Sequence, residues 1–462
     1  MQFSQTLRLG LGIGAGALVA VGLVANSVLH QARETAQAYL FGYPLVLMEL
    51  TKQHQLLLGT SAINALSHRT RFPDATFNSV VSPNVDTLYT ISHFDLRREP
   101  LVLSIPDTAG RFYMMPIMDA WTNVVTSPGT RTIGTDAKIY LIAGPAWQGL
   151  VPADVELVRM PTALAWMIGR IKSSGPRDYA EINELQQQFK LMPLSAWQGH
   201  PSEPAPVAVI NLPRLERSQS PDRQLASWSQ DEFFTAFCQL LPGNPPRGED
   251  AAMMARIKAT GLLSDDCKPH LSPLQRFGSA IGYKKVIVAL DNNRALLEKL
   301  PTSNGWRIGY EFGEYATRYE QRALVAKVGL GANLAADAIY PNLWKDQDGQ
   351  PLDGNNRYVL HFAKEQLPPV RAFWSLTLYN AAQFLSTNPL NRYALGDRDD
   401  LRYNADGSLD LYIQHDRPAE PAQRNNWLPA PQESFNLVLR LYWPEESVLN
   451  QQWLPPVIQR LP

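Results

Sequence analysis

The chain has 462 residues, which is enough for two or three domains with hydrophobic cores of their own. Its 42 basic and 43 acidic residues nearly cancel, so the overall charge argues against nucleic acid as a partner. The 36 prolines exceed the usual share of about 5% and predict many turns and rigid connections.

The first thirty residues have the composition of a targeting segment. Residues Leu9–Leu29 contain no charge and follow Arg8. A helix of about 21 residues is about 31 Å long and matches the hydrocarbon core of a membrane. Two interpretations stay open: a signal peptide cleaved after Ser27, or an uncleaved anchor, which the length of the run favours. Both predict export to the periplasm or cell envelope, and an uncleaved run would hold the protein at the inner membrane.

Apolar patterns divide the remaining chain into three parts. Residues 31–58 predict one helix that is broken at Tyr43-Pro44. Short apolar or alternating runs, separated by proline and glycine, predict antiparallel strands in the next part and again after residue 356. Helical spacing dominates between them. We therefore expect a β-rich domain with a leading helix at 31–160, a mainly helical connector at 161–345 and a β-rich domain at 346–462.

Several longer motifs resemble a known pair of domains. Residues 82–89 (SPNVDTLY), 118–123 (MDAWTN) and 127–132 (SPGTRT) resemble the bacterial domain of unknown function numbered 1254. Residues 367–380 (LPPVRAFWSLTLYN) and 426–431 (NWLPAP) resemble its usual partner, domain of unknown function 1214. The resemblance covers most of the chain after about residue 36. It implies two antiparallel, jelly-roll-like β-sandwiches around a helical segment, often in exported proteins, and no established activity. Together with the N-terminal hydrophobic helix, it predicts a mixed, β-rich fold.

Standard catalytic motifs are missing from the sequence. It contains no G-x-S-x-G elbow, H-E-x-x-H, Walker loop or C-x-x-C, and no two of its eight histidines are four residues apart. We therefore predict no metal site and assign no cofactor, and whether the protein is an enzyme stays open.

The first candidate site residues lie in the 1254-like part, at Asn84, Asp86 and Tyr89. Asp86 could act as a general base or a ligand anchor, with Asn84 and Tyr89 orienting a polar group. The alternative is that Asn84 and Asp86 cap a turn through their own backbone.

A second group comprises Asp119, Trp121 and Arg131. Asp119 interrupts an apolar strand, where a carboxylate needs a partner, and Arg131 is the expected one. A structural ion pair is the favoured interpretation. If Asp119 and Asp86 converged, the pKa of one would rise and general acid–base catalysis would become credible.

A third group lies in the 1214-like part and comprises Arg371, Trp374, Arg392 and Tyr393. Arginine beside aromatic rings suits saccharides, aromatic acids or lipids, through stacking and bidentate contacts. The alternative is that the aromatic residues belong to the core of a sandwich.

The only two cysteines, Cys238 and Cys267, lie in the helical region. An exported compartment permits a disulfide between them, and two buried free thiols are the alternative.

These observations favour a protein that binds a small polar, saccharide or lipid ligand of unknown identity where its domains meet. An envelope enzyme that uses Asp86 and Asp119 for acid–base chemistry is the alternative, and a non-catalytic scaffold of an envelope complex is the third interpretation.

Overall fold

The computed structural model describes residues 3–462 except 79, 201–209, 211, 214 and 293–299, with side chains from Gly22 onwards. The chain divides into two compact units. The helical unit comprises Met1–His54, Val207–Asn293 and Ala316–Leu330. The β unit comprises Gln55–Pro206, Arg294–Tyr315 and Gly331–Pro462.

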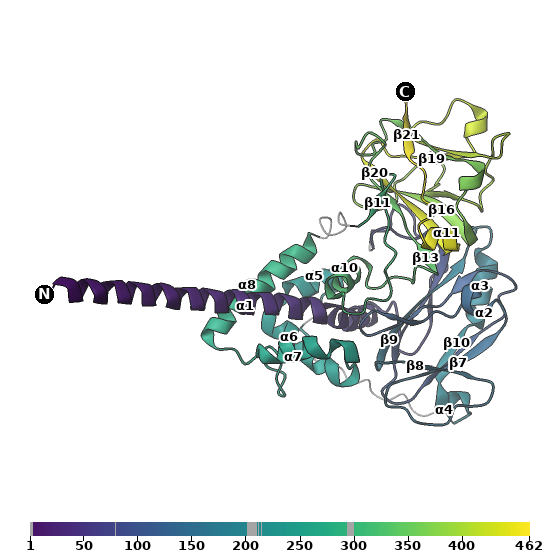
Figure 1. Cartoon of the computed structure of the whole chain (residues 1–462). Helices are drawn as coiled ribbons and strands as arrows, with labels where there is room; N and C mark the ends of the chain where they lie inside the picture. Colours follow the sequence, from purple (N-terminus) through teal and green to yellow (C-terminus); the bar gives the residue numbers. More distant parts are fainter. Residues whose placement is uncertain (1–2, 79, 201–209, 211, 214, 293–299) are drawn as a thin grey trace. The chain divides into compact units, whose positions relative to one another are not determined.

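The helical unit is built around the long helix α1 (Figure 1). Its principal helices are α1 (Phe3–Leu58), α5 (Pro221–Ser227), α6 (Gln230–Leu240), α7 (Ala251–Ala259), α8 (Pro273–Asp291) and α10 (Tyr319–Gly329). Aromatic rings join α1 to its neighbours: the ring centroid of Tyr39 lies 4.4 Å from that of Phe233 and 5.2 Å from that of Tyr283. A capping box begins α6, in which the Ser229 side chain accepts from the backbone N–H of Glu232.

Helix α1 continues through Pro44, so the predicted break at Tyr43-Pro44 is wrong. Proline inside a helix costs about 3 kcal/mol because it removes one backbone hydrogen bond and crowds the preceding turn. Here Phe41, Tyr43 and Leu45 are all almost completely buried. Apolar contacts on all sides of the helix outweigh the cost of the proline.

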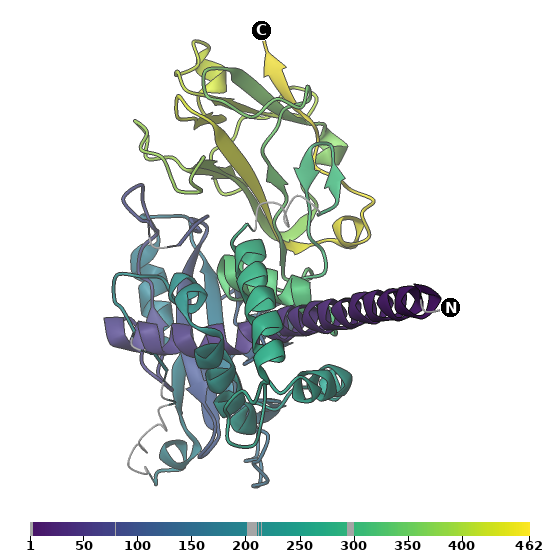
Figure 2. The same ribbon diagram turned by 90° about the vertical axis from the view of Figure 1, so that its left-hand side faces the viewer.

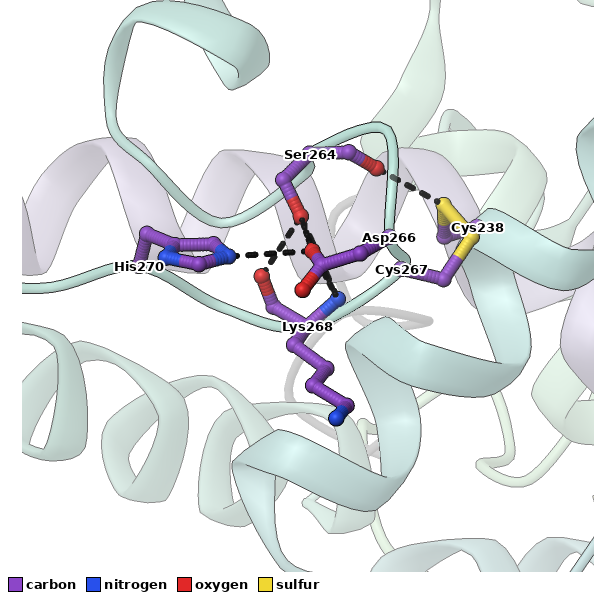
Figure 3. Close-up of a disulfide and its surroundings, with 6 residues drawn as sticks. All are labelled: Cys238, Ser264, Asp266, Cys267, Lys268 and His270. Carbon is purple, nitrogen blue, oxygen red and sulfur yellow. Dashed lines mark hydrogen bonds and ion pairs between the residues drawn. A yellow bond between two sulfur atoms is a disulfide. The ribbon is translucent and has the colours of Figure 1, made fainter.

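A disulfide joins Cys238 of α6 to Cys267 (Figure 3). The loop that carries Cys267 is held by its own polar side chains: Asp266 accepts a hydrogen bond from Ser264 Oγ at 2.5 Å and contacts His270 Nε2 at 2.9 Å. These contacts lower the pKa of Asp266 to about 2, and the hydrogen bond from Ser264 has the largest effect.

The first part of the β unit contains two sheets that enclose one hydrophobic core. One sheet has the order β1 (Ser67–His68), β2 (Thr87–Asp95), β9 (Leu164–Lys172), β5 (Ile117–Asp119), β6 (Val124–Thr126), with β4 (Tyr113–Met114) paired to β9. The other has the order β10 (Lys190–Pro193), β3 (Leu101–Ile105), β7 (Lys138–Ala143), β8 (Glu156–Arg159). Leu88 and Met167 of the first sheet share a core with Leu103 and Ile142 of the second. Since β9 pairs with β2 along its whole length, these sheets extend past the expected boundary at residue 160.

The last part of the β unit repeats this arrangement. One sheet has the order β11 (Thr302–Ser303), β12 (Trp306–Arg307), β14 (Asn342–Leu343), β20 (Phe435–Pro444), β16 (Val370–Asn380), β17 (Ala394–Gly396), with β13 (Ala338–Ile339) paired to β20. The other has the order β19 (Trp427–Pro429), β18 (Leu409–Gln414), β15 (Arg357–Phe362), β21 (Ile458–Leu461). Leu376 and Leu439 of the first sheet pack with Leu360 and Leu411 of the second. Figure 2 shows the long strands of this part as yellow-green arrows.

Shorter elements connect these strands and helices. They are α2 (Thr130–Ile133), α3 (Tyr179–Gln188), α4 (Leu194–Trp197), α11 (Glu446–Leu449) and the 3-10 helices η1 (Leu241–Gly243), η2 (Gly248–Asp250), η3 (Lys364–Gln366) and η4 (Pro421–Gln423). The fold is therefore mixed and β-rich, with mostly antiparallel sheets, as the sequence predicts.

Within the part of the chain whose side chains are described, no helix is both long and apolar enough to cross a bilayer. The uncharged run 9–29 falls mainly on residues 1–21, whose side chains lie outside that part. Its interpretation as a signal peptide or anchor stays a prediction.

Candidate functional site

Asn84 organises the turn that leads into strand β2. Its Oδ1 accepts hydrogen bonds from the backbone N–H groups of Asp86 at 2.7 Å and Thr87 at 3.0 Å, which is the expected Asx turn. Its amide Nδ2 donates to the Tyr442 hydroxyl at 2.7 Å. Both ends of the Asn84 amide are thus used to hold this turn against strand β20.

Asp86 is completely buried and binds three side chains of the 1214-like part. Its Oδ1 lies 2.6 Å from Arg398 Nη2, and its Oδ2 lies 3.8 Å from Arg440 Nε. The Ser375 hydroxyl donates to the same Oδ2 at 2.7 Å. Asp86 therefore does not cap its own turn, and it ties the two β-rich parts of the unit together by charge.

A buried tyrosine and arginine network continues from Asp86. Arg440 donates to Thr377 Oγ1 at 2.6 Å and to the Tyr379 hydroxyl at 2.5 Å, and that hydroxyl donates to Pro83 O at 2.7 Å. Burial raises the pKa of Tyr379 to about 12, although Arg440 acts in the opposite direction. Burial alone would lower the pKa of Arg440, but Tyr379 and Asp86 raise it above its usual value. At neutral pH the phenol is therefore a neutral donor and the guanidinium is charged.

Tyr89 contacts an arginine of its own sheet. The Arg170 guanidinium carbon lies 5.1 Å from the centre of the Tyr89 ring. Arg170 Nη1 donates to Asn333 Oδ1 at 2.8 Å, and Asn333 Nδ2 donates to the Tyr340 hydroxyl at 2.6 Å. Tyr89 thus supports a buried arginine through its ring.

A cleft of about 610 Å³, which we call the junction cleft, lies beside the Asp86 network. The 1254-like part contributes Phe72, Asp74, Val85 and Tyr179 to its lining, and the 1214-like part contributes Asn391, Arg392, Tyr393, Arg398 and Asp399. The cleft thus combines three aromatic rings with amide, carboxylate and guanidinium groups.

Arg398 connects the junction cleft with Asp86. Besides its ion pair, its Nη2 donates to Val85 O at 3.0 Å, and only 10% of its side chain is exposed. Its Nη1 is buried without an acceptor among the described residues. Next to the cleft, Arg398 therefore carries a buried guanidinium N–H group for which the described residues provide no acceptor.

Arg392 and Tyr393, which the sequence analysis selects, both line the junction cleft. Arg392 Nη1 donates to the backbone oxygens of Arg424, Asn425 and Trp427 at 3.0–3.3 Å. These bonds fix one nitrogen of its guanidinium, and Arg392 forms no ion pair with the described carboxylates.

Arg371 lies in a different cleft, of about 420 Å³, together with Lys172 and Trp443. Its guanidinium carbon lies 5.9 Å from the centre of the Trp443 ring, and Lys172 Nζ lies 4.9 Å from that of Phe373. Trp374 is 5% exposed and packs in the core of the last two sheets. The third predicted group is therefore dispersed over two clefts and a core.

Asp119 and Asp86 do not converge. Asp119 pairs with Ala165 at one end of β9, and Thr87, next to Asp86, pairs with Lys172 at the other. Ala165 and Lys172 are seven positions apart along β9, which corresponds to about 23 Å. The two carboxylates therefore cannot share a proton or a substrate atom.

Asp119 instead organises its own turn. Its Oδ1 accepts from the backbone N–H groups of Trp121 at 3.0 Å and Asn123 at 2.9 Å. The expected partner Arg131 pairs with Asp337 at 2.6 Å, so that prediction is wrong. Trp121 is 1% exposed and cannot form the wall of an open site.

Sequence reasoning missed Arg398 and Arg440, the two partners of Asp86. Arg440 left a detectable signal, because it is the only charged residue in the apolar run 435–443 and buried charge requires a partner. Arg398 lies in a polar loop between Asp397 and Asp399, where nothing in the local pattern indicates burial. Among the described residues, no group of three histidine, cysteine, aspartate or glutamate side chains could hold a metal ion.

Comparison with known proteins identifies both β-rich parts. A family model described as "Protein of unknown function (DUF1254)" matches residues 63–193, and one described as "Protein of unknown function (DUF1214)" matches residues 337–446. A search of curated proteins finds no match.

Two solved structures are similar. The VPA0106 protein of Vibrio parahaemolyticus has 23% sequence identity and a TM-score of 0.70, over 94% of this chain and 100% of that chain. An uncharacterised protein of Burkholderia cenocepacia has 12% identity and a TM-score of 0.45, over 95% of each chain. The first likeness supports the fold over almost the whole length.

Proposed function

The chain belongs to the family that joins domain of unknown function 1254 to domain of unknown function 1214, and we propose that it is an envelope protein that binds a small saccharide in the junction cleft. The family has no assigned activity, so the proposal rests on the cleft itself. The main supporting observation is that a cleft of about 610 Å³ combines three aromatic rings with both hydrogen-bond donors and hydrogen-bond acceptors.

The chemistry of the cleft suits a polyhydroxylated ligand. Aromatic faces pack against the C–H faces of a sugar ring, and hydroxyl groups both donate and accept. Asp74 and Asp399 supply acceptors, Arg392 supplies a donor, and Asn391 supplies both. The volume lies within the usual range of about 300–1,000 Å³ for small-molecule sites.

Location in the envelope is part of the same proposal. The uncharged run 9–29 supports export, and the Cys238–Cys267 disulfide is typical of an oxidising compartment. The paired sheets also support the finer description of each β-rich part as a jelly-roll-like sandwich. Acid–base catalysis by Asp86 and Asp119 is not part of the proposal, because about 23 Å of sheet separates them. The scaffold interpretation lacks a comparable observation.

Substitutions in the junction cleft should weaken saccharide binding. We expect Asn391→Gly and Tyr393→Ala each to raise the Kd about tenfold, because each removes contacts worth about 1.4 kcal/mol. Glycine suits position 391, where φ is 48°, so this change removes the amide without backbone strain. Isothermal titration with a panel of free mono- and disaccharides measures the effect.

The matched control for these variants is Tyr403→Ala, in the same β-rich part. Tyr403 is 51% exposed and does not line the junction cleft, so its replacement should leave the Kd unchanged. Native mass spectrometry of protein from its own host supplies an independent readout. If Asn391→Gly and Tyr393→Ala bound saccharides as tightly as the control Tyr403→Ala, the proposed site would be wrong. If the retained ligand contained no sugar units, the proposed ligand class would be wrong.

The N-terminal segment should direct export of a passenger. A fusion of residues 1–31 to alkaline phosphatase, which is active only where its disulfides form, should give enzyme activity in intact cells. Replacing Leu18 and Val21 by Asp places two charges in the run and should abolish that activity. Phosphatase found inactive in the cytoplasm with the unchanged segment would contradict the envelope location.

A further inference from the structure

Helix α8 carries a stripe of apolar side chains that the other described residues leave largely uncovered. Phe277 is 61% exposed, Val288 is 62% exposed and Leu274 is 37% exposed. These residues and the half-buried Ile281 are spaced by three, four and seven positions and therefore share one face of the helix. Exposed lysines at 284 and 285 lie on either side of this stripe.

The opposite face of α8 crosses α1 at very short range. A Cβ at Gly278 would lie 2.7 Å from Val28 O, and one at Gly282 would lie 2.0 Å from Ala32 O. The two glycines therefore permit backbone contact between the helices. Figures 1 and 2 both show α8 passing across α1.

The order of the contacts shows which way the apolar stripe faces. A helix turns by 100° per residue, and this places Gly278, Gly282, Ser279 and Tyr283 in that order around the circumference of α8. They meet α1 at Val28, Ala32, Thr35 and Tyr39, in the same order. From Gly278 round to Tyr283, the contacted position on α1 thus shifts from Val28 to Tyr39, which is about 16 Å towards the C-terminus of α1. The stripe continues round the helix in the other direction, so it faces the N-terminal part of α1.

That part of α1 is itself apolar. Leu23 and Val24 are 66% and 49% exposed, and they belong to the uncharged run 9–29. Helix α8 therefore crosses α1 near Val28, where the uncharged run 9–29 ends. Its apolar stripe faces the N-terminal direction of α1, along which this run continues.

We propose that the apolar stripe of α8 lies in the interface of the membrane that holds the N-terminal run. This inference rests on the envelope location proposed above, with the N-terminal run retained as a membrane anchor. An apolar helix face that lies in this interface is buried about 5–10 Å into the boundary between headgroups and acyl chains. Phe277 and Leu274 enter this boundary, and the lysines at 284 and 285 reach anionic headgroups. The stripe thereby orients the helical unit on the bilayer surface.

Spin labels at two positions test the proposal in the full-length chain. The variants Phe277→Cys and Glu320→Cys are labelled under non-reducing conditions and reconstituted into vesicles of phosphatidylcholine and phosphatidylglycerol. Glu320 is exposed on α10, next to Tyr319, whose ring contacts Phe41, about 20 Å along α1 from Val28. We expect the ratio of oxygen to nickel-chelate accessibility to be about tenfold higher at 277, because the polar chelate is excluded from the acyl boundary.

Flotation of the same vesicles separates this inference from anchoring by the N-terminal run. If the protein floats and both labels reach the chelate equally, the stripe faces water and the proposal fails alone. If the protein does not float, anchoring itself fails. Dipolar broadening at 277 that disappears on dilution with unlabelled protein would show a second copy of the chain on the stripe and would also overturn the proposal.

Discussion

Replacing Asp86 by Asn is expected to lower the free energy of unfolding of the β unit by about 3–5 kcal/mol, because it removes the negative charge of a buried ion pair and leaves the positive charges in place. The amide keeps the size of the carboxylate and can still accept from Ser375 Oγ. It carries no charge, however, so the guanidinium groups of Arg398 and Arg440 stay buried without their carboxylate. Uncompensated buried charge is among the most destabilising changes that a single substitution makes.

Urea unfolding, followed by tryptophan fluorescence, measures the change. The matched control is Asp136→Asn in the same β-rich part: Asp136 is exposed and in no ion pair with the described residues, so we expect a change within about 0.5 kcal/mol. The double variant with Arg398→Gln should recover part of the loss, and the resulting double-mutant cycle gives the coupling energy. Unchanged stability of Asp86→Asn together with lost ligand binding would show instead that Asp86 is a ligand anchor.

Removal of the disulfide should produce the second large effect. We expect the double variant Cys238→Ala and Cys267→Ala to lose about 3.5 kcal/mol of stability in the helical unit, because the cross-link restricts the unfolded chain. The bonded residues are 29 positions apart, so the closed loop is long enough for a substantial entropic contribution. The same bond holds the loop that precedes α8 against α6 (Figure 3).

Reducing agent provides the control for this variant. The unchanged protein should become as unstable as the variant when it is reduced, and the variant should not respond. Alkylation of unfolded, unreduced protein followed by mass spectrometry tests the bond directly. Two freely labelled thiols under those conditions would show that the bond does not form.

The sequence by itself determined the β-rich character and the two-domain family. Alternating apolar residues, interrupted by proline and glycine, identify strands because the side chains of a strand alternate between two faces. Specific motifs such as residues 82–89 identify the family independently of packing. Arg392 and Tyr393 could also be selected as ligand-binding candidates, since arginine beside an aromatic residue has a recognisable chemistry.

Only the tertiary structure decided which charges meet. Asp86 finds its partners more than 300 positions away, at Arg398 and Arg440. Arg131, the expected partner of Asp119, pairs instead with Asp337. Ion pairing depends on which segments far apart in the sequence lie side by side, and local periodicity carries no information about that. Pro44 shows the same limit within a helix. The free-energy cost of a proline inside a helix is known from the sequence, but the tertiary packing that outweighs this cost is not.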